Sequence, residues 1–162
     1  MRIELRSETP EDTRGVGEAV ASLLRPGDAI ALTGELGAGK TTLVQGAARG
    51  LGVAGHVASP TFTLVREHPG PVPLFHVDVY RLDRVQDVLD LGLEEMIDDG
   101  GVVFVEWGDA IEALLPAGHL TIELTSTEVD DARRVVIAAA GPSWSARWER
   151  LERLLEPWLI GP

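Results

Sequence analysis

The 162-residue chain contains no cysteine, which excludes disulfide bonds, thiolate metal ligands and a cysteine nucleophile. It has no apolar run near the roughly 20 residues that a membrane-spanning helix needs, and its first residues form no apolar signal region. We therefore expect a cytoplasmic protein without a membrane partner. The length suits one domain with a proper core and is too short for two ordinary domains.

Positive charge is also scarce. The chain has 14 Lys and Arg side chains against 26 Asp and Glu side chains, which leaves a net charge of −12. Proteins bind a phosphate backbone through clusters of Lys and Arg, so this balance argues against nucleic-acid binding by the chain alone. An acidic surface suits docking onto a basic partner, or it serves only solubility.

Lysine is nearly absent. Lys40 is the single lysine, and it lies in Gly-Glu-Leu-Gly-Ala-Gly-Lys-Thr over residues 34–41. This segment fits the P-loop pattern of two glycines that flank four residues, followed by Lys and a hydroxyl. In such a loop the backbone N–H groups point at phosphate oxygens, the compact ammonium reaches the terminal phosphates, and the Thr41 hydroxyl is placed to ligate Mg²⁺.

The flanking segments support this interpretation over a glycine-rich turn that matches by chance. Residues 29–33 form an apolar run typical of a buried strand, and apolar residues recur at helical spacing over residues 43–51 before Gly52. Strand, loop and helix place the positive end of the helix dipole at the phosphates. We predict a bound nucleoside triphosphate. ATP is favoured because no second lysine remains for the Asn-Lys-x-Asp motif that reads guanine.

Alternating apolar segments predict an α/β fold of the P-loop NTPase type, with a mostly parallel sheet, helices on both faces and an antiparallel C-terminal extension. Helices are expected after an N-cap at Thr9, after the P-loop, and over residues 85–96 with a break at Gly92. The expected strands cover residues 3–6, 29–33, 61–65, 74–79, 102–105, 120–124 and 134–139.

We predict a P-loop ATPase domain over residues 1–142, followed by an amphipathic helix over residues 143–162. Ser143 would be the N-cap of this helix. The helix would pack on its own domain or on a partner. Its apolar stripe comprises Trp144, Trp148, Leu151, Leu155 and Trp158.

Two acids end apolar strands, where a P-loop protein needs a carboxylate for magnesium or its water shell. Asp78 ends the first of these strands and Glu106 ends the second. At the carboxyl edge of a parallel sheet both would face the crevice of the P-loop, although either acid could instead be structural. The hydroxyls of residues 59–63 belong either to a loop that senses the terminal phosphate or to an ordinary turn. His76 and Trp107 are expected to be packing residues.

Four motifs, in order, resemble the bacterial TsaE (YjeE) ATPases over roughly residues 10–139. They are the P-loop, Ser-Pro-Thr-Phe-Thr-Leu-Val at 59–65, His-Val-Asp-Val-Tyr-Arg-Leu at 76–82 and Val-Glu-Trp at 105–107. The resemblance implies a small P-loop ATPase needed to make threonylcarbamoyladenosine beside the anticodon of ANN-reading tRNAs. It also implies work with the TsaD–TsaB heterodimer, in which TsaD carries the transferase site. The partners would then provide the main tRNA contacts.

The resemblance further implies a set of site residues for ATP and Mg²⁺. Thr41 and Glu106 would hold magnesium, and Asp78 would be a magnesium or water-positioning acid. Thr61 would act in the first switch loop, and Arg133 would approach the nucleotide. Catalysis would depend on Lys40, Asp78, Glu106 and Thr61. The phosphates would be cradled by Gly37, Ala38, Gly39, Lys40, Thr41 and Thr42.

Two departures from the family stand out: Glu35 replaces an Asp found in many members, and the Trp-rich C-terminal helix has no clear counterpart. Two other functions remain open at this point. A small-molecule kinase of the same fold would need an arginine-bearing lid, for which Arg81 and Arg84 are the candidates. A nucleotide-gated binding module would use the same acids with negligible hydrolysis.

Overall fold

The computed structural model describes residues 1–35, 37–55, 57, 65–79 and 85–161. Within them, one sheet has the strand order β1-β7-β6-β2-β5-β4-β3. The strands are β1 (Arg2–Ser7), β2 (Ala29–Thr33), β3 (Val65–His68), β4 (Leu74–Asp78), β5 (Val102–Glu106), β6 (Leu120–Ser126) and β7 (Arg133–Ala139). The helices are α1 (Pro10–Ala21), α2 (Lys40–Gly50), α3 (Val85–Leu89), α4 (Leu93–Asp98) and α5 (Pro142–Leu155), with 3₁₀ helices η1 (Gly108–Leu114) and η2 (Glu156–Trp158).

The centre of the sheet is parallel and its two sides are antiparallel. Strands β6, β2, β5 and β4 are parallel neighbours, whereas β7 pairs antiparallel with both β6 and β1. The predicted α/β class with an antiparallel C-terminal part is confirmed. The sheet is less parallel than expected, because β3 and β4 also pair antiparallel. The connection over residues 69–73 is too short for a parallel crossover.

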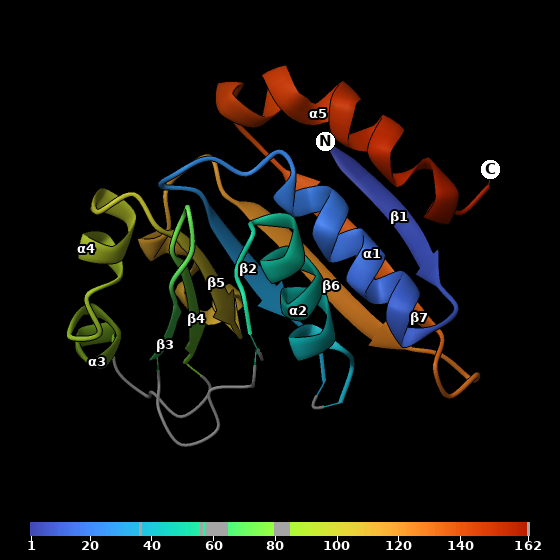
Figure 1. Cartoon of the computed structure of the whole chain (residues 1–162), viewed down its shortest axis with the longest axis horizontal. Coiled ribbons are helices and arrows are strands. Elements are labelled where there is room, and N and C mark those ends of the chain that lie inside the picture. Colours follow the sequence, from blue (N-terminus) through green and yellow to red (C-terminus); the bar gives the residue numbers. More distant parts are fainter. Residues whose placement is uncertain (36, 56, 58–64, 80–84, 162) are drawn as a thin grey trace.

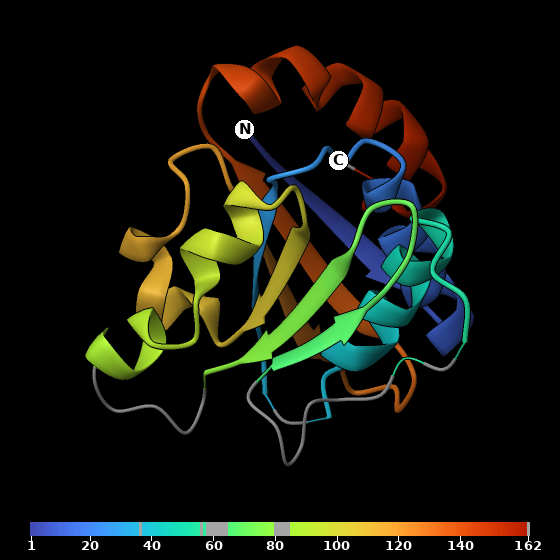
Figure 2. The same ribbon diagram turned by 60° about the vertical axis from the view of Figure 1, so that its left-hand side comes forward.

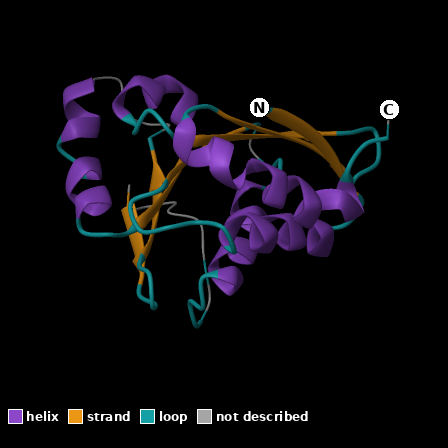
Figure 3. Ribbon diagram, turned by 90° about the horizontal axis from the view of Figure 1, so that it is seen from above, coloured by secondary structure: helices purple, strands orange, loops and turns teal. Residues whose placement is uncertain are grey.

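Helices cover both faces of the sheet, as predicted (Figure 1, Figure 3). Side chains of α1, α2 and α5 share one buried cluster with one face, and those of α3, α4 and η1 share a second cluster with the other. The turned view places α2 on one side of β3 and β4, and α3 with α4 on the other (Figure 2). All five residues of β5 are buried, as expected of a strand covered on both faces.

Helices α1 and α2 touch through their backbones at two glycines. A Cβ added to Gly17 would lie 2.1 Å from the carbonyl oxygen of Leu43, and one added to Gly46 would lie 1.9 Å from the carbonyl oxygen of Arg14. No other residue type permits this approach without a shift of the backbone. The glycines therefore set the distance of α2, and with it the P-loop, from α1.

The C-terminal helix begins earlier than predicted. Gly141 is its N-cap and Pro142 is its first residue, so the prediction of Ser143 as N-cap is wrong. Proline suits the first helical position because its fixed φ already matches the helix. Trp144, Leu151 and Leu155 are buried in the same core as α1 and β1, and Trp158 packs against Gly15 of α1.

Several local predictions are confirmed. The Thr9 side chain accepts a hydrogen bond from the Asp12 N–H, 3.1 Å away, and caps α1. Gly92 adopts φ 80° between α3 and α4, where the helical pattern was expected to break. Of the strand expected over residues 61–65, residues 61–64 lie outside the described residues, and β3 extends from Val65 to His68. Among the described helices, none has the length and apolar character needed to cross a membrane.

Candidate nucleotide-binding site

The P-loop connects the end of β2 to the start of α2, as its sequence predicts. Gly37 and Gly39 have φ values of 83° and 104°, in the region that side chains disfavour. Gly39 is the N-cap of α2, and no side chain caps this helix start in the described part of the chain. Because the first N–H groups of a helix have no partner within it, the start of α2 presents donors and a positive dipole end to an anion.

The Lys40 ammonium lies at the carboxyl edge of the sheet, inside the loop. Its Nζ donates to the Gly34 carbonyl oxygen at 2.5 Å and lies 4.0 Å from the centroid of the Trp107 ring. Trp107 directly follows β5 and has φ 64°, which is uncommon for a residue other than glycine. Its backbone N–H donates to the Leu32 carbonyl oxygen of β2 at 2.7 Å. These contacts place Lys40 beside the end of β5.

Asp78 and Glu106 are the last residues of β4 and β5. They are direct partners in the parallel register, and Glu106 also pairs with Leu32 of β2. Directly paired residues of parallel strands point to the same face of a sheet. The two acids and the P-loop therefore share one edge of the sheet, as the sequence predicted.

Glu106 carries a buried oxygen that could accept a ligand. The side chain is nearly buried, and within the described residues its Oε2 has no hydrogen-bond partner. His76 Nε2 lies 3.0 Å from this oxygen, but the two groups are not aligned as a hydrogen bond. A buried carboxylate oxygen without a donor is costly, and a cation would compensate that cost.

The chemistry of the donor set fits Mg²⁺ bound together with phosphates. Two carboxylates and the Thr41 hydroxyl are hard oxygen donors, which Mg²⁺ prefers in combination with phosphate oxygens and water. The described residues contain no cluster of three His, Asp or Glu side chains that could hold a metal by themselves. Thr41 and Thr42 lie half-buried in the first turn of α2.

Arg133, the first residue of β7, contacts the P-loop although β6 lies between β7 and β2 in the sheet. Its Nε donates to the Ala38 carbonyl oxygen at 3.0 Å, and its Nη2 donates to the Gly37 carbonyl oxygen at 3.3 Å. A third donor, Nη1, reaches the Ala132 carbonyl oxygen at 2.9 Å. The guanidinium thus connects the outer turn of the loop to the start of β7.

A hollow of about 320 Å³ adjoins the P-loop. Thr33, Gly34 and Glu35 line one side of it, Trp107 a second and the end of β6 a third. The predicted switch residue Thr61 lies outside the described residues, as do the rest of its loop and the lid candidates Arg81 and Arg84.

Sequence reasoning missed three contacts of this site. Trp107 packs against the second buried cluster, as expected of a core or rim residue, but its ring also lies over the Lys40 ammonium. His76 is buried, as expected, but it also lies beside Glu106. The Arg133 guanidinium reaches the loop backbone. Two signals were available: Trp107 directly follows Glu106, and the family resemblance had already placed Arg133 near the nucleotide.

The chain is similar to proteins named for tRNA modification. A family model described as "Threonylcarbamoyl adenosine biosynthesis protein TsaE" matches residues 7–135. A relative from Bacillus subtilis (strain 168), named "tRNA threonylcarbamoyladenosine biosynthesis protein TsaE", is 40% identical over 153 residues, which cover 94% of this chain and 95% of the relative. A relative of the same name from Streptomyces coelicolor is 43% identical over 140 residues, covering 82% and 93%. The crystal structure of Bacillus subtilis YdiB matches with a TM-score of 0.80 at 37% identity, covering 94% of this chain and 95% of that one.

Proposed function

The chain belongs to the TsaE family of tRNA threonylcarbamoyladenosine biosynthesis, and from this membership we propose that it is the ATP-binding and ATP-hydrolysing subunit of that process. It acts with TsaD and TsaB in forming threonylcarbamoyladenosine next to the anticodon of ANN-reading tRNAs. The observation that supports this most is the position of the Lys40 ammonium, inside a glycine loop and beside the strand that ends in Glu106.

Each residue of the site has a role in this proposal. When bound, Mg²⁺ and ATP supply a polarised phosphoanhydride bond. The N–H groups of residues 37–42 bind the phosphates, and Lys40 exchanges the Gly34 carbonyl oxygen for a phosphate oxygen. Thr41 and Glu106 hold the metal, while Asp78 orients a water molecule beside it. Thr61 would complete the site from the first switch loop.

In this proposal the partners supply the positive charge that tRNA binding needs and that this chain lacks. With a net charge of −12, the chain is unsuited to bind tRNA directly, and tRNA reaches the complex through TsaD–TsaB. Hydrolysis is slow in the isolated subunit and rises when the heterodimer binds. The subunit does not itself transfer the threonylcarbamoyl group, and it works in the cytoplasm.

The test is steady-state ATP hydrolysis by the purified protein, alone and with TsaD–TsaB from the same organism. We expect the heterodimer to raise the rate. Lys40→Ala should abolish both nucleotide binding and hydrolysis, because the ammonium contacts the terminal phosphates. Glu106→Gln should stop hydrolysis while ATP still supports assembly with the heterodimer.

Three results would contradict the proposal. An ATP affinity of Lys40→Ala equal to that of the wild type would contradict the assignment of the segment around Lys40 as a P-loop. A rate of ATP hydrolysis that does not change when TsaD–TsaB is added would contradict the proposed partnership. Transfer of phosphate to a metabolite at an ordinary kinase rate would favour the alternative of a small-molecule kinase.

A further inference from the structure

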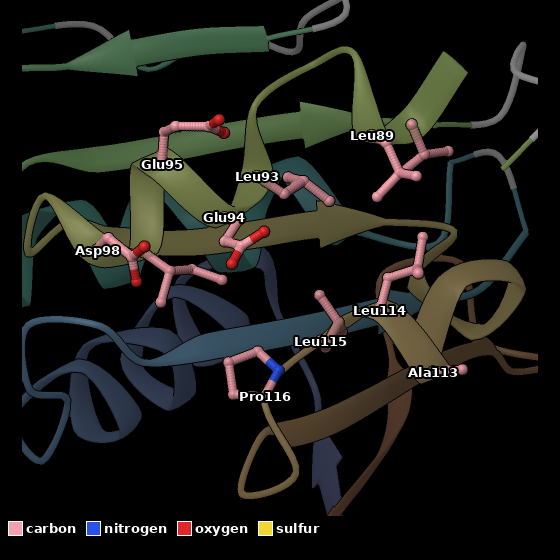
Figure 4. Close-up of a pocket in the computed structure, with 11 residues that line it drawn as sticks. Leu89, Leu93, Glu94, Glu95, Asp98, Ala113, Leu114, Leu115 and Pro116 are labelled. Atoms are coloured by element: carbon pink, nitrogen blue, oxygen red, sulfur yellow. The ribbon is translucent and has the colours of Figure 1, made fainter. Parts of the chain in front are cut away.

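A groove of about 550 Å³ lies on the sheet face opposite α2, between α3, α4 and the end of η1 (Figure 4). Glu94 and Asp98 lie on the α4 side, and Leu114, Leu115 and Pro116 lie on the opposite side. The groove shares no residue with the proposed nucleotide site. Its volume is in the range of sites that bind small ligands or a few side chains.

The inner surface of the groove is apolar. Leu93 and Leu115 are buried at its base, and Leu114 is half-buried. Leu89 lies at the edge with 51% of its surface exposed. An exposed apolar side chain at the border of an apolar groove marks a contact site for another molecule more often than an isolated exposed apolar side chain does.

The rim of the groove is acidic. Glu94, Glu95 and Asp98 are exposed, and none of them has an ion pair or side-chain hydrogen bond with another described residue. The described residues that line the groove include no Lys, Arg or His. Unpaired carboxylates around an apolar surface are complementary to apolar side chains flanked by cationic ones.

The groove is also connected to the proposed site through the chain. The α3–α4 segment follows β4, which ends in Asp78, and η1 follows Glu106 and Trp107 directly. An occupant of the groove would contact both segments that leave the two acid-bearing strands. Such an occupant is therefore placed to influence hydrolysis.

We propose that this groove binds a segment of the TsaD–TsaB heterodimer that carries apolar side chains flanked by Lys or Arg. This inference rests on the proposed function, because it takes the heterodimer as the partner. The apolar side chains occupy the space beside Leu89, Leu93 and Leu115, and the basic groups pair with Glu94 and Asp98.

Affinity for purified TsaD–TsaB, measured in the presence of ATP at low and high salt, tests the proposal. Leu89→Asp replaces an apolar side chain at the edge of the groove with a charged one. The double variant Glu94→Arg/Asp98→Arg reverses the charge of the rim. Matched controls lie on α5 and at its C-cap. Leu154→Asp alters a leucine of similar exposure, 40%, and Glu149→Arg/Glu156→Arg reverses two exposed acids. ATP binding and circular dichroism establish that each variant is folded.

We expect each groove variant to bind the heterodimer at least about tenfold more weakly, and the controls to stay within about twofold of the wild type. The rim variant should also lose most of the salt dependence of binding. If the wild type binds the heterodimer and the groove variants bind it as tightly as the controls do, the groove is not the contact site. That result would leave the proposed partnership in place. No binding of the wild type would overturn the groove and the proposed partnership together.

Discussion

At the residue scale, the P-loop depends on a side chain that is distant in the sequence. Arg133 donates to the carbonyl oxygens of Gly37 and Ala38. These bonds orient the two peptide units, so that the opposite edge of the loop presents its N–H groups to a phosphate. We therefore expect Arg133 to support the proposed phosphate binding by holding the loop in shape.

Arg133→Ala is expected to weaken ATP binding by about tenfold, since hydrogen bonds from a charged donor contribute about 1.5–3 kcal/mol each. The neighbouring Arg134 is the control, because its guanidinium pairs with Glu4 at 2.8 Å on the surface and Arg134→Ala leaves the loop intact. Titration with a fluorescent ATP analogue measures both affinities. Equal affinities for the two variants would contradict this role.

His68 makes stability depend on pH. Its ring is buried at the end of β3, and burial, followed by the nearby His76 and Arg66, lowers the pKa of His68 from its ordinary value near 6.5. The folded protein thus favours the neutral ring, whereas the unfolded chain takes up a proton near pH 6.5. The contribution to stability is complete above that pH and is lost as the pH falls below it toward the lowered pKa of His68 in the folded protein.

We expect the free energy of unfolding to fall less in His68→Gln than in the wild type when the pH is lowered from 7.5 to 5.5. Urea denaturation at both pH values measures the difference. The two proteins should show parallel behaviour above pH 7.5, where both states of His68 are neutral. Equal losses of stability in acid would show that another group is responsible.

At the scale of elements, the contact between α1 and α2 determines where the P-loop helix lies. Gly46 sits against the backbone of Arg14, so that even a methyl group would have to displace one helix. In an isolated helix, alanine in place of glycine is favourable by about 1 kcal/mol. Close packing reverses that preference here.

Gly46→Ala is expected to lower the free energy of unfolding by about 2 kcal/mol or more, as overpacked sites do. ATP affinity should fall with it, because α2 carries Lys40, Thr41 and Thr42. Gly118→Ala is the control, since a Cβ there would make only ordinary contacts, 3.8 Å or more from its neighbours. A gain of stability in Gly46→Ala would contradict the packing described for α1 and α2.

At the scale of the whole molecule, an ion pair between buried Arg147 and half-buried Asp28 joins the C-terminal helix to the residue before β2. Arg147 of α5 is 4% exposed, and its guanidinium bonds to both carboxylate oxygens of Asp28, at 2.6 and 3.3 Å. It also donates to the Leu23 carbonyl oxygen at 2.9 Å and stacks over Trp144. The pair fixes α5 beside the segment that leads into β2.

Asp28→Ala is expected to lower the free energy of unfolding by about 3 kcal/mol, because it leaves the Arg147 charge buried without its carboxylate. Glu149→Ala removes an exposed pair with Arg153 on the same helix and should change stability by less than about 0.5 kcal/mol. Chemical denaturation measures both values. Similar effects for the two variants would show that burial of Arg147 adds nothing to its pairing.

The sequence by itself determined the local parts of this protein. The strand, the glycine loop and the helix around Lys40 could be predicted because each depends on residues adjacent in the chain. Asp78 and Glu106 could be placed at one edge of the sheet because each ends an apolar strand, and parallel strands end at the same edge. Thr9 could be predicted as a cap for the same local reason.

Only the tertiary structure decided the contacts between distant segments. Strand order brings Arg133 to the P-loop and places β3 and β1 at opposite edges of the sheet. It also brings the Trp107 ring over Lys40 and Arg147 to Asp28. Hydrophobic periodicity indicates which side of a helix or strand is buried, but it does not indicate which other element covers that side. Those contacts therefore follow from the packing of the whole chain.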